Sequence, residues 1–179
     1  RHDPIDLVLF RQKNLGLTLQ TNLIKRLSPD SFSIMEIKNE WEAGIAEKML
    51  KFPFLGEKIE GTWNVKLSNE FHMTNDSHLF RTEPGPGRLP LYEGKMIHQF
   101  RHDFAQPRYW VDEAEGRKAV LGKTNDEGQR LDYQDFRLAY RAIASSTNQR
   151  TMIMEILPQN VFYGHSLNAD SIKKNNSDK

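Results

Sequence analysis

The 179-residue sequence contains no cysteine. It therefore forms no disulfide bonds and offers no thiolate ligands to a metal, which is the usage expected of a protein in a reducing cytoplasm. No apolar run approaches the roughly 18 residues that a membrane helix needs, and no signal-peptide pattern is visible. These absences predict a globular, cytoplasmic protein without a membrane partner.

The sequence also lacks an excess of either charge. Its 25 Lys and Arg residues oppose 24 Asp and Glu residues, and the formal net charge is +1. This balance alone argues against a protein that binds nucleic acid through bulk charge, but the distribution is uneven. Residues 136–154 contain three Arg and no acid, whereas residues 112–135 contain seven acids and four bases. Basic stretches beside an acidic one predict a local positive face.

The periodicity of apolar residues predicts an α+β domain with a mixed β-sheet and a few flanking helices. Strands are expected at 5–9, 15–19, 32–37, 63–67, 96–100, 108–111 and 151–157. One helix is expected to follow Asn39, with Glu42 completing a capping box, and to bury Trp41, Ile45 and Met49. A second helix is expected over 112–122, closed by Gly122.

The segment 133–143 fits both a helix and a strand. We favour the strand, because alternation would then place Arg137 and Arg141 on one exposed face. The apolar residues of the segment, Phe136, Leu138 and Tyr140, would be buried behind them. On that face the small residue Ala139 would separate the two Arg residues, an arrangement that suits the close approach of a phosphate backbone.

Three segments carry most of the functional information. They read FHMTNDSHLF (71–80), LPLYEGKMIHQF (89–100) and YRAIASSTNQRTMIMEILP (140–158). In this order they resemble the target recognition region of large bacterial adenine-N6 DNA methyltransferases, a family that includes fused type II restriction–modification enzymes. The resemblance runs from about Leu27 to His165. It departs from the family pattern at 101–103, where Arg-His-Asp stands in place of Asp-His-Arg.

The resemblance implies a module that binds double-stranded DNA and reads its sequence. Lys and Arg would contact phosphates, while Gln and Asn suit adenine and Arg suits guanine. The residues expected to contact DNA are Lys95, His98, Gln99, Arg108, Arg137, Arg141, Ser146, Thr147, Asn148 and Arg150. The basic residues of two motifs, Lys95, Arg141 and Arg150, are expected on one face. The apolar residues of the second motif, Leu91, Met96, Ile97 and Phe100, are expected in the core.

The catalytic and cofactor-binding motifs of this family are missing from this sequence. It contains neither the Asn/Asp-Pro-Pro-aromatic tetrapeptide that holds the target amino group nor a glycine-rich turn for S-adenosylmethionine. We therefore expect no catalytic residue and no cofactor in this chain. The resemblance implies a parent protein that uses S-adenosylmethionine, and Mg²⁺ if it also cleaves DNA.

The expected organisation has three parts. Residues 1–26 would form a connecting segment that packs on an upstream methyltransferase domain of the same polypeptide. Residues 27–167 would form the DNA target recognition domain, and residues 168–179 a disordered tail. Because the sequence starts at Arg1 and not at a Met, we expect it to be a fragment of a longer chain, with processing or tag removal as the alternative.

Two alternatives stay open. Asp30, Glu36 and Lys38 spell the P-D-x(n)-E-x-K pattern of metal-dependent nucleases, in which two acids hold a divalent metal. Only five residues separate these acids, which leaves little room for the hairpin that would bring them together. The second alternative is a scaffold module that binds no DNA, with the motifs packing against a partner domain. The histidines predict no metal site, because a zinc site needs about four converging ligands.

Overall fold

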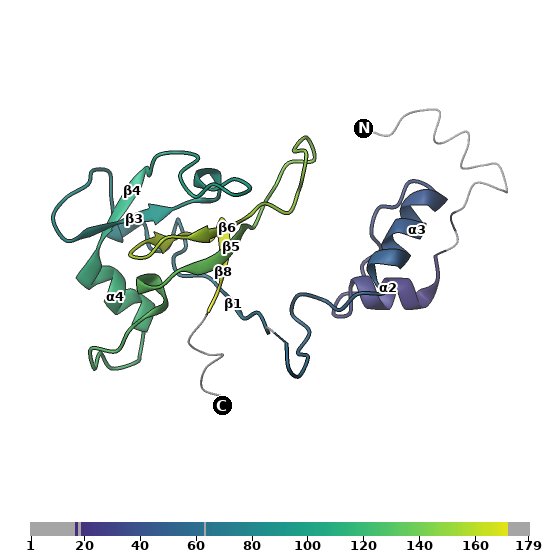
Figure 1. Cartoon of the computed structure of the whole chain (residues 1–179), viewed down its shortest axis with the longest axis horizontal. Helices are drawn as coiled ribbons and strands as arrows, with labels where there is room; N and C mark the ends of the chain where they lie inside the picture. Colours follow the sequence, from purple (N-terminus) through teal and green to yellow (C-terminus); the bar gives the residue numbers. More distant parts are fainter. Residues whose placement is uncertain (1–16, 18, 63, 172–179) are drawn as a thin grey trace. The chain divides into compact units, whose positions relative to one another are not determined.

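The computed structural model describes residues 17, 19–62 and 64–171 (Figure 1). The chain divides into two compact units, residues 1–57 and 58–179, and each is described by itself. The boundary after Glu57 differs from the one expected after residue 26. In the described ranges, no helix is long and apolar enough to cross a membrane.

The first unit contains helices α2 (Thr21–Leu27) and α3 (Glu40–Met49). The expected N-cap is confirmed, because the Asn39 side chain accepts a hydrogen bond from the Glu42 N–H at 2.9 Å. The Glu42 carboxylate accepts from the Lys38 N–H at 2.8 Å and not from the Asn39 N–H, so the reciprocal bond of the expected capping box is not the one formed. The Asn39 contact satisfies a backbone donor at the helix start that has no partner within the helix.

Two expectations for this unit are wrong. The stripe of α3 is not buried, since Trp41 is 75% exposed, Ile45 37% and Met49 67%. Residues 32–37 form no strand. A unit of this size has little interior in which to bury a helix face, and a lone extended segment needs neighbouring strands for stability.

The second unit contains two four-stranded sheets (Figure 1). The strand order in the first is β1-β8-β5-β6, from Leu67–Ser68, Leu167–Asp170, Arg137–Arg141 and Met154–Leu157. The order in the second is β2-β4-β3-β7, from Phe80–Arg81, Tyr109–Asp112, Arg88–Tyr92 and Phe162–Tyr163. All pairings are antiparallel except β3 with β7. The α+β class is confirmed, with two sheets in place of the single one expected.

Several elements lie close to where the sequence predicts them. Strands β4 and β6 fall within or beside the ranges expected at 108–111 and 151–157. Helix α4 (Glu113–Leu121) ends at Gly122, whose φ of 59° is the left-handed value that favours glycine. The strand expected at 63–67 is reduced to β1, and Trp63 lies outside the described residues.

The segment 96–100 is not a strand. The 3₁₀-helix η2 (Gly94–Met96) occupies its start, and a tight turn follows. Met96 and Ile97 are nevertheless buried, at 1% and 0% exposed. Their side chains reach the core from an irregular backbone, which explains why the apolar pattern suggested a strand. Two further 3₁₀-helices of the same length, η1 (Ser77–Leu79) and η3 (Asp132–Gln134), precede β2 and β5.

The core of the second unit lies in two clusters. One joins residues of both sheets, among them Tyr92, Met96, Ile97, Ala139, Leu157, Val161, Tyr163, Leu167 and Ala169. The other surrounds the second sheet and contains Phe71, Leu91, Val111, Tyr133 and Phe162. The expected burial of Leu91, Met96 and Ile97 is therefore confirmed. Because η2 contributes to the first cluster, the turn that follows it is anchored on the core.

Helix α4 packs closely on strand β7 through Gly116. A Cβ atom built on Gly116 would lie 2.5 Å from the ring of Phe162 and 3.1 Å from Val111. Real Cβ atoms do not approach other atoms so closely, so this contact requires glycine despite its low helix propensity.

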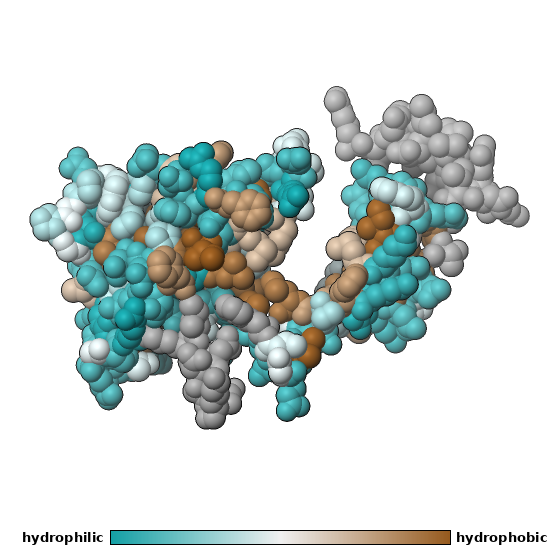
Figure 2. Space-filling model, viewed as in Figure 1, coloured by the Kyte–Doolittle hydropathy of each residue, from teal (hydrophilic) through white to brown (hydrophobic). Residues whose placement is uncertain are grey.

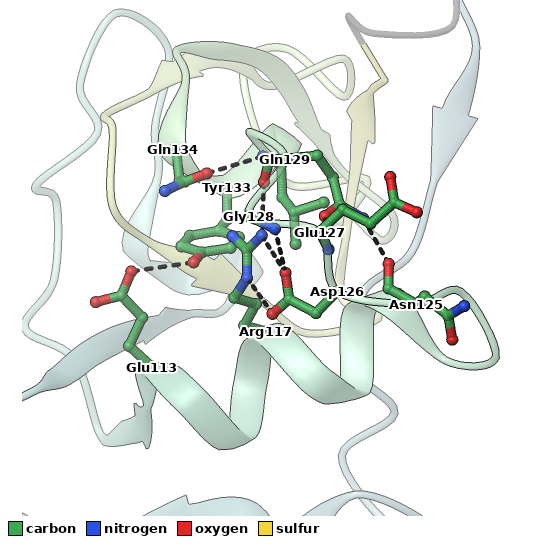
Figure 3. A network of polar contacts seen from close by, with 10 residues as sticks. Glu113, Arg117, Asn125, Asp126, Glu127, Gly128, Gln129, Tyr133 and Gln134 are labelled. Atoms are coloured by element: carbon green, nitrogen blue, oxygen red, sulfur yellow. Dashed lines mark hydrogen bonds and ion pairs between the residues drawn. The ribbon is translucent and has the colours of Figure 1, made fainter.

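The loop after α4 is held by one arginine (Figure 3). Arg117 donates from Nε and Nη2 to the Asp126 carboxylate, at 2.7 Å each, and from Nη2 to the Gln129 carbonyl at 2.6 Å. On the same helix, Glu113 accepts a hydrogen bond from the Tyr133 hydroxyl at 3.0 Å. The guanidinium fork thus fixes the loop against the helix that carries it.

The end of the second unit also differs from expectation. Residues 168–170 complete strand β8, with Ala169 0% and Asp170 1% exposed, and Ser171 is buried as well. The expected disordered tail is therefore wrong for these residues, because pairing with β1 and β5 buries a segment of polar composition. Residues 172–179 lie outside the described ranges, as do the strands expected at 5–9 and 15–19 apart from Leu17 and Leu19.

Candidate nucleic-acid interface

Two of the three sequence motifs meet at a pocket of about 250 Å³. The motif at 89–100 and the motif at 140–158 both line it, with His98, Gln99, Phe100, Asn148, Gln149, Arg150 and Ile153. We name this site the amide pocket, after its three Gln and Asn side chains. Amide groups donate and accept hydrogen bonds at once, which is the capacity needed to read the edge of a nucleotide base.

A side chain from one motif binds the backbone of the other. The Arg141 guanidinium donates from Nε and Nη2 to the carbonyl oxygen of Ile97, with the Nε distance at 3.0 Å. Partial burial lowers the pKa of Arg141, although an arginine remains protonated in proteins. Arg141 therefore serves first to position the turn that carries His98 and Gln99.

A second pocket, of about 320 Å³, has Arg141 in its lining. Its lining consists of Glu93, Gly94, Lys95, Arg141, Ile143 and Ser166, and we name it the Glu93 pocket. Gly94 donates its N–H to the Ser166 hydroxyl at 2.9 Å. A Cβ on Gly94 would lie 2.9 Å from the Ser166 carbonyl oxygen, so glycine permits this close approach.

Lys95 and Arg108, which are expected to contact DNA phosphates, both form an ion pair with the Glu93 carboxylate. Arg108 donates to the Glu93 Oε1 atom at 3.0 Å, and the Lys95 Nζ lies 3.3 Å from Oε2. The Glu93 side chain is 12% exposed, whereas Lys95 and Arg108 are 53% and 54% exposed. Two accessible cations around one carboxylate leave one net positive charge for a phosphate.

A strained turn forms the edge of the amide pocket. The His98 N–H donates to the Arg101 carbonyl at 2.8 Å and the Arg101 N–H donates to the His98 carbonyl at 2.9 Å. Gln99 and Phe100 occupy the two central positions, and Phe100 has a φ of 63°. The Gln99 Oε1 atom is buried and has no hydrogen-bond partner within the described structure. A buried acceptor without a hydrogen bond destabilises the fold, and a donor on a bound ligand would satisfy it.

The remaining expected contacts lie on the β5–β6 connection, which extends beyond the strands in Figure 1. The Ser145 Oγ and Thr147 Oγ1 atoms lie 2.7 Å apart and share a hydrogen bond, and the Asn148 N–H donates to the Ser145 carbonyl at 3.1 Å. Ser146, Thr147 and Arg150 are exposed. Across the described residues Arg150 has no carboxylate partner, so its charge is available to a ligand.

Arg137 does not belong to this surface. The strand expected around it is confirmed, but its side chain is 1% exposed and paired with the Glu70 carboxylate. It also donates to the Val161 carbonyl at 2.6 Å and lies over the Tyr163 ring. Burial raises the pKa of Glu70 to about 7, although the Arg137 charge and the Tyr163 N–H lower it. The expected DNA contact by Arg137 is wrong, because a guanidinium enclosed in this way cannot reach a phosphate.

The faces of β5 are the reverse of those expected. Phe136, expected inside, is 57% exposed, and Ala139 on the face of Arg137 is 0% exposed. Ile156 of β6, directly opposite Leu138, is 54% exposed. Figure 2 shows apolar residues in brown on this side of the second unit, over β5 and β6.

The structure thus sorts the expected site residues into groups. His98, Gln99, Asn148 and Arg150 line the amide pocket, and Lys95 and Arg141 line the Glu93 pocket. Arg108 reaches the latter through Glu93, while Ser146 and Thr147 are exposed on the β5–β6 connection. Sequence reasoning missed Gln149 and Phe100 as lining residues. Gln149 stands in the third motif between two expected contacts, which was a usable signal, whereas the apolar pattern placed Phe100 in the core.

The nuclease residues are not assembled into a site. Asp30, Glu36 and Lys38 stand in an irregular segment, with Asp30 and Glu36 exposed. Across the parts of the chain that the structure describes, no three His, Cys, Asp or Glu side chains are grouped to hold a metal. Of the histidines, the His72 ring stacks on the His165 ring with 4.8 Å between their centroids, and His98 packs near Phe104.

No protein-family model, curated protein or solved structure matches this chain.

Proposed function

We propose that the second unit is the DNA target recognition domain of an adenine-N6 DNA methyltransferase, of the group that includes combined restriction–modification enzymes. One observation carries the proposal: motifs distant in sequence meet at the amide pocket. Packing alone does not require three amide side chains and an Arg150 without a carboxylate partner in the described part of the chain at one surface pocket. Hydrogen-bonding groups beside an accessible cation match a partner that presents both base edges and phosphates.

The residues of this surface would have three roles: contact with phosphates, recognition of bases and positioning of the two motifs. Arg150, and Lys95 and Arg108 around Glu93, would contact phosphates and set the register of the protein on DNA. Gln99 and Asn148 would read base edges, since Gln and Asn pair with two atoms of adenine in the major groove. Arg141 would hold the two motifs together through Ile97.

The chemical step would reside elsewhere in the parent protein. An upstream domain of the same cytoplasmic polypeptide would bind S-adenosylmethionine and transfer the methyl group to adenine, a reaction that requires the base to leave the helix. Mg²⁺ would be needed only for a parent that also cleaves DNA. This chain would supply the choice of sequence.

Salt titration of DNA binding tests the proposal. Log affinity of the chain for a duplex should fall linearly with log salt, and Arg150→Ala should flatten the slope by about 0.9, since one fewer counterion is released. Arg130→Ala is the matched control. Arg130 is 60% exposed on another loop and pairs with Asp135, so its loss should leave the slope unchanged.

Base reading is tested by a second comparison. Gln99→Ala or Asn148→Ala should weaken binding of the cognate sequence by about 1–3 kcal/mol and that of other sequences little. If wild type and all variants show no DNA affinity at low salt, the motifs instead serve a scaffold that packs against a partner domain.

A further inference from the structure

Phe100 is in an unfavourable state that the fold does not explain. Its side chain is 81% exposed, and its φ of 63° lies in the left-handed region. Large side chains rarely adopt this backbone region, and an exposed phenyl ring forgoes the stabilisation of burial. Residues held in such conformations cluster at functional sites.

The turn itself would accept another residue more readily. His98 and Arg101 exchange both backbone hydrogen bonds across it, and Phe100 holds its third position. A positive φ at that position is the arrangement in which Gly or Asn is preferred. Folding alone would therefore favour Gly or Asn at position 100.

The surroundings of Phe100 indicate what it contacts. It lines the amide pocket with Gln99, Asn148 and Arg150. An apolar ring beside amide groups and the exposed Arg150 cation fits neither a lipid surface nor an apolar protein groove, but it fits the flat faces and polar edges of nucleotide bases.

We propose that Phe100 stacks on a base of the bound DNA, next to the bases whose edges the amide pocket reads. The inference rests on the proposed function and adds a contact that hydrogen bonding does not supply. Every base has an aromatic face, so the contact tolerates different sequences. Where the ring enters a base step, it also unstacks that step and bends the duplex.

Duplexes carrying the fluorescent base 2-aminopurine at successive positions test this inference with the full chain. Binding should change the fluorescence at one or two adjacent positions, and Phe100→Ala should abolish that change. Its affinity should fall roughly 5- to 150-fold, the range expected for loss of one aromatic stack. Phe100→Tyr and Phe100→Trp should retain both the signal and the affinity. Phe136→Ala, which removes another exposed ring away from the pocket, should alter neither.

Phe100→Asn separates stacking from folding. It suits the positive φ, so we expect a higher Tm than wild type together with loss of the fluorescence change. If DNA binds and both Phe100→Ala and Phe100→Asn keep the wild-type affinity and signal, stacking is excluded while the proposed function stands. If the wild-type chain binds none of the duplexes at low salt, the inference and the proposed function fail together.

Discussion

Arg141 holds the carbonyl oxygen of Ile97 with two donors of its guanidinium, across a separation of 44 residues. The bond joins strand β5 to the turn after η2, and so joins the two motifs that line the amide pocket. A carbonyl in an irregular segment has no strand partner, so the arginine supplies what a sheet would otherwise provide. The geometry of the candidate interface therefore depends on this contact.

Arg141→Lys should destabilise the second unit by about 1–3 kcal/mol. Lysine keeps the charge but cannot place two fixed donors on one oxygen, and the Ile97 carbonyl would lose bonds within a partly buried site. Urea unfolding measures the loss. Because the charge is preserved, the salt slope of DNA binding should change less than in Arg150→Ala. Unchanged stability would show that the Ile97 contact is not formed in solution.

Arg137→Ala should destabilise the second unit by about 3–5 kcal/mol, since it leaves the buried Glu70 carboxylate without its cation. The control is the double variant Glu70→Gln/Arg137→Met, which removes both charges and keeps an acceptor for the Tyr163 N–H. It should recover most of the loss in denaturant unfolding, and DNA binding should be close to wild type. A double variant as unstable as the single one would contradict the pairing.

Two glycines within helices should respond oppositely to alanine. Gly116→Ala should destabilise by about 1–3 kcal/mol through the clash with Phe162, which outweighs the higher helix propensity of alanine. Gly44→Ala is the matched control, since a Cβ there meets nothing within 4 Å. It should stabilise α3 by up to about 1 kcal/mol. Hydrogen exchange measured separately on peptides of α3 and α4 distinguishes the two effects.

The loop after α4 should show a pH dependence set by Asp126. Hydrogen bonds from Arg117 lower the pKa of Asp126 from its usual 3.8 to about 2. A lowered pKa means that the ionised carboxylate stabilises the fold above the unfolded value of 3.8, and that this contribution is lost as pH falls through about 2.

NMR titration of the Asp126 carboxyl group checks this prediction directly. Arg117→Gln should return the Asp126 pKa towards 3.8 and remove the corresponding pH dependence of stability. Because the Asp126 side chain is 47% exposed and solvent screens its charge, the effect on overall stability should be small. A pKa that stays near 2 in the variant would mean that Arg117 is not its cause.

Local chemistry accounts for the features that the sequence predicted well. The Asn39 cap, the stop of α4 at Gly122 and strand β4 depend on residues only a few positions apart. Such signals operate within one turn or one strand, so they are readable without knowledge of what packs nearby.

The faces and partners of these elements were decided by tertiary structure. Alternation correctly placed Arg137 and Arg141 on one side of β5, but period two does not say which side meets the core. Glu70, 67 positions before Arg137, compensates its charge and allows that side to face inward. Phe100 shows the converse. Its hydrophobic side chain suggested the core, yet a turn closed by backbone hydrogen bonds directs it to the surface, because residues far apart in sequence determine where space remains to be filled.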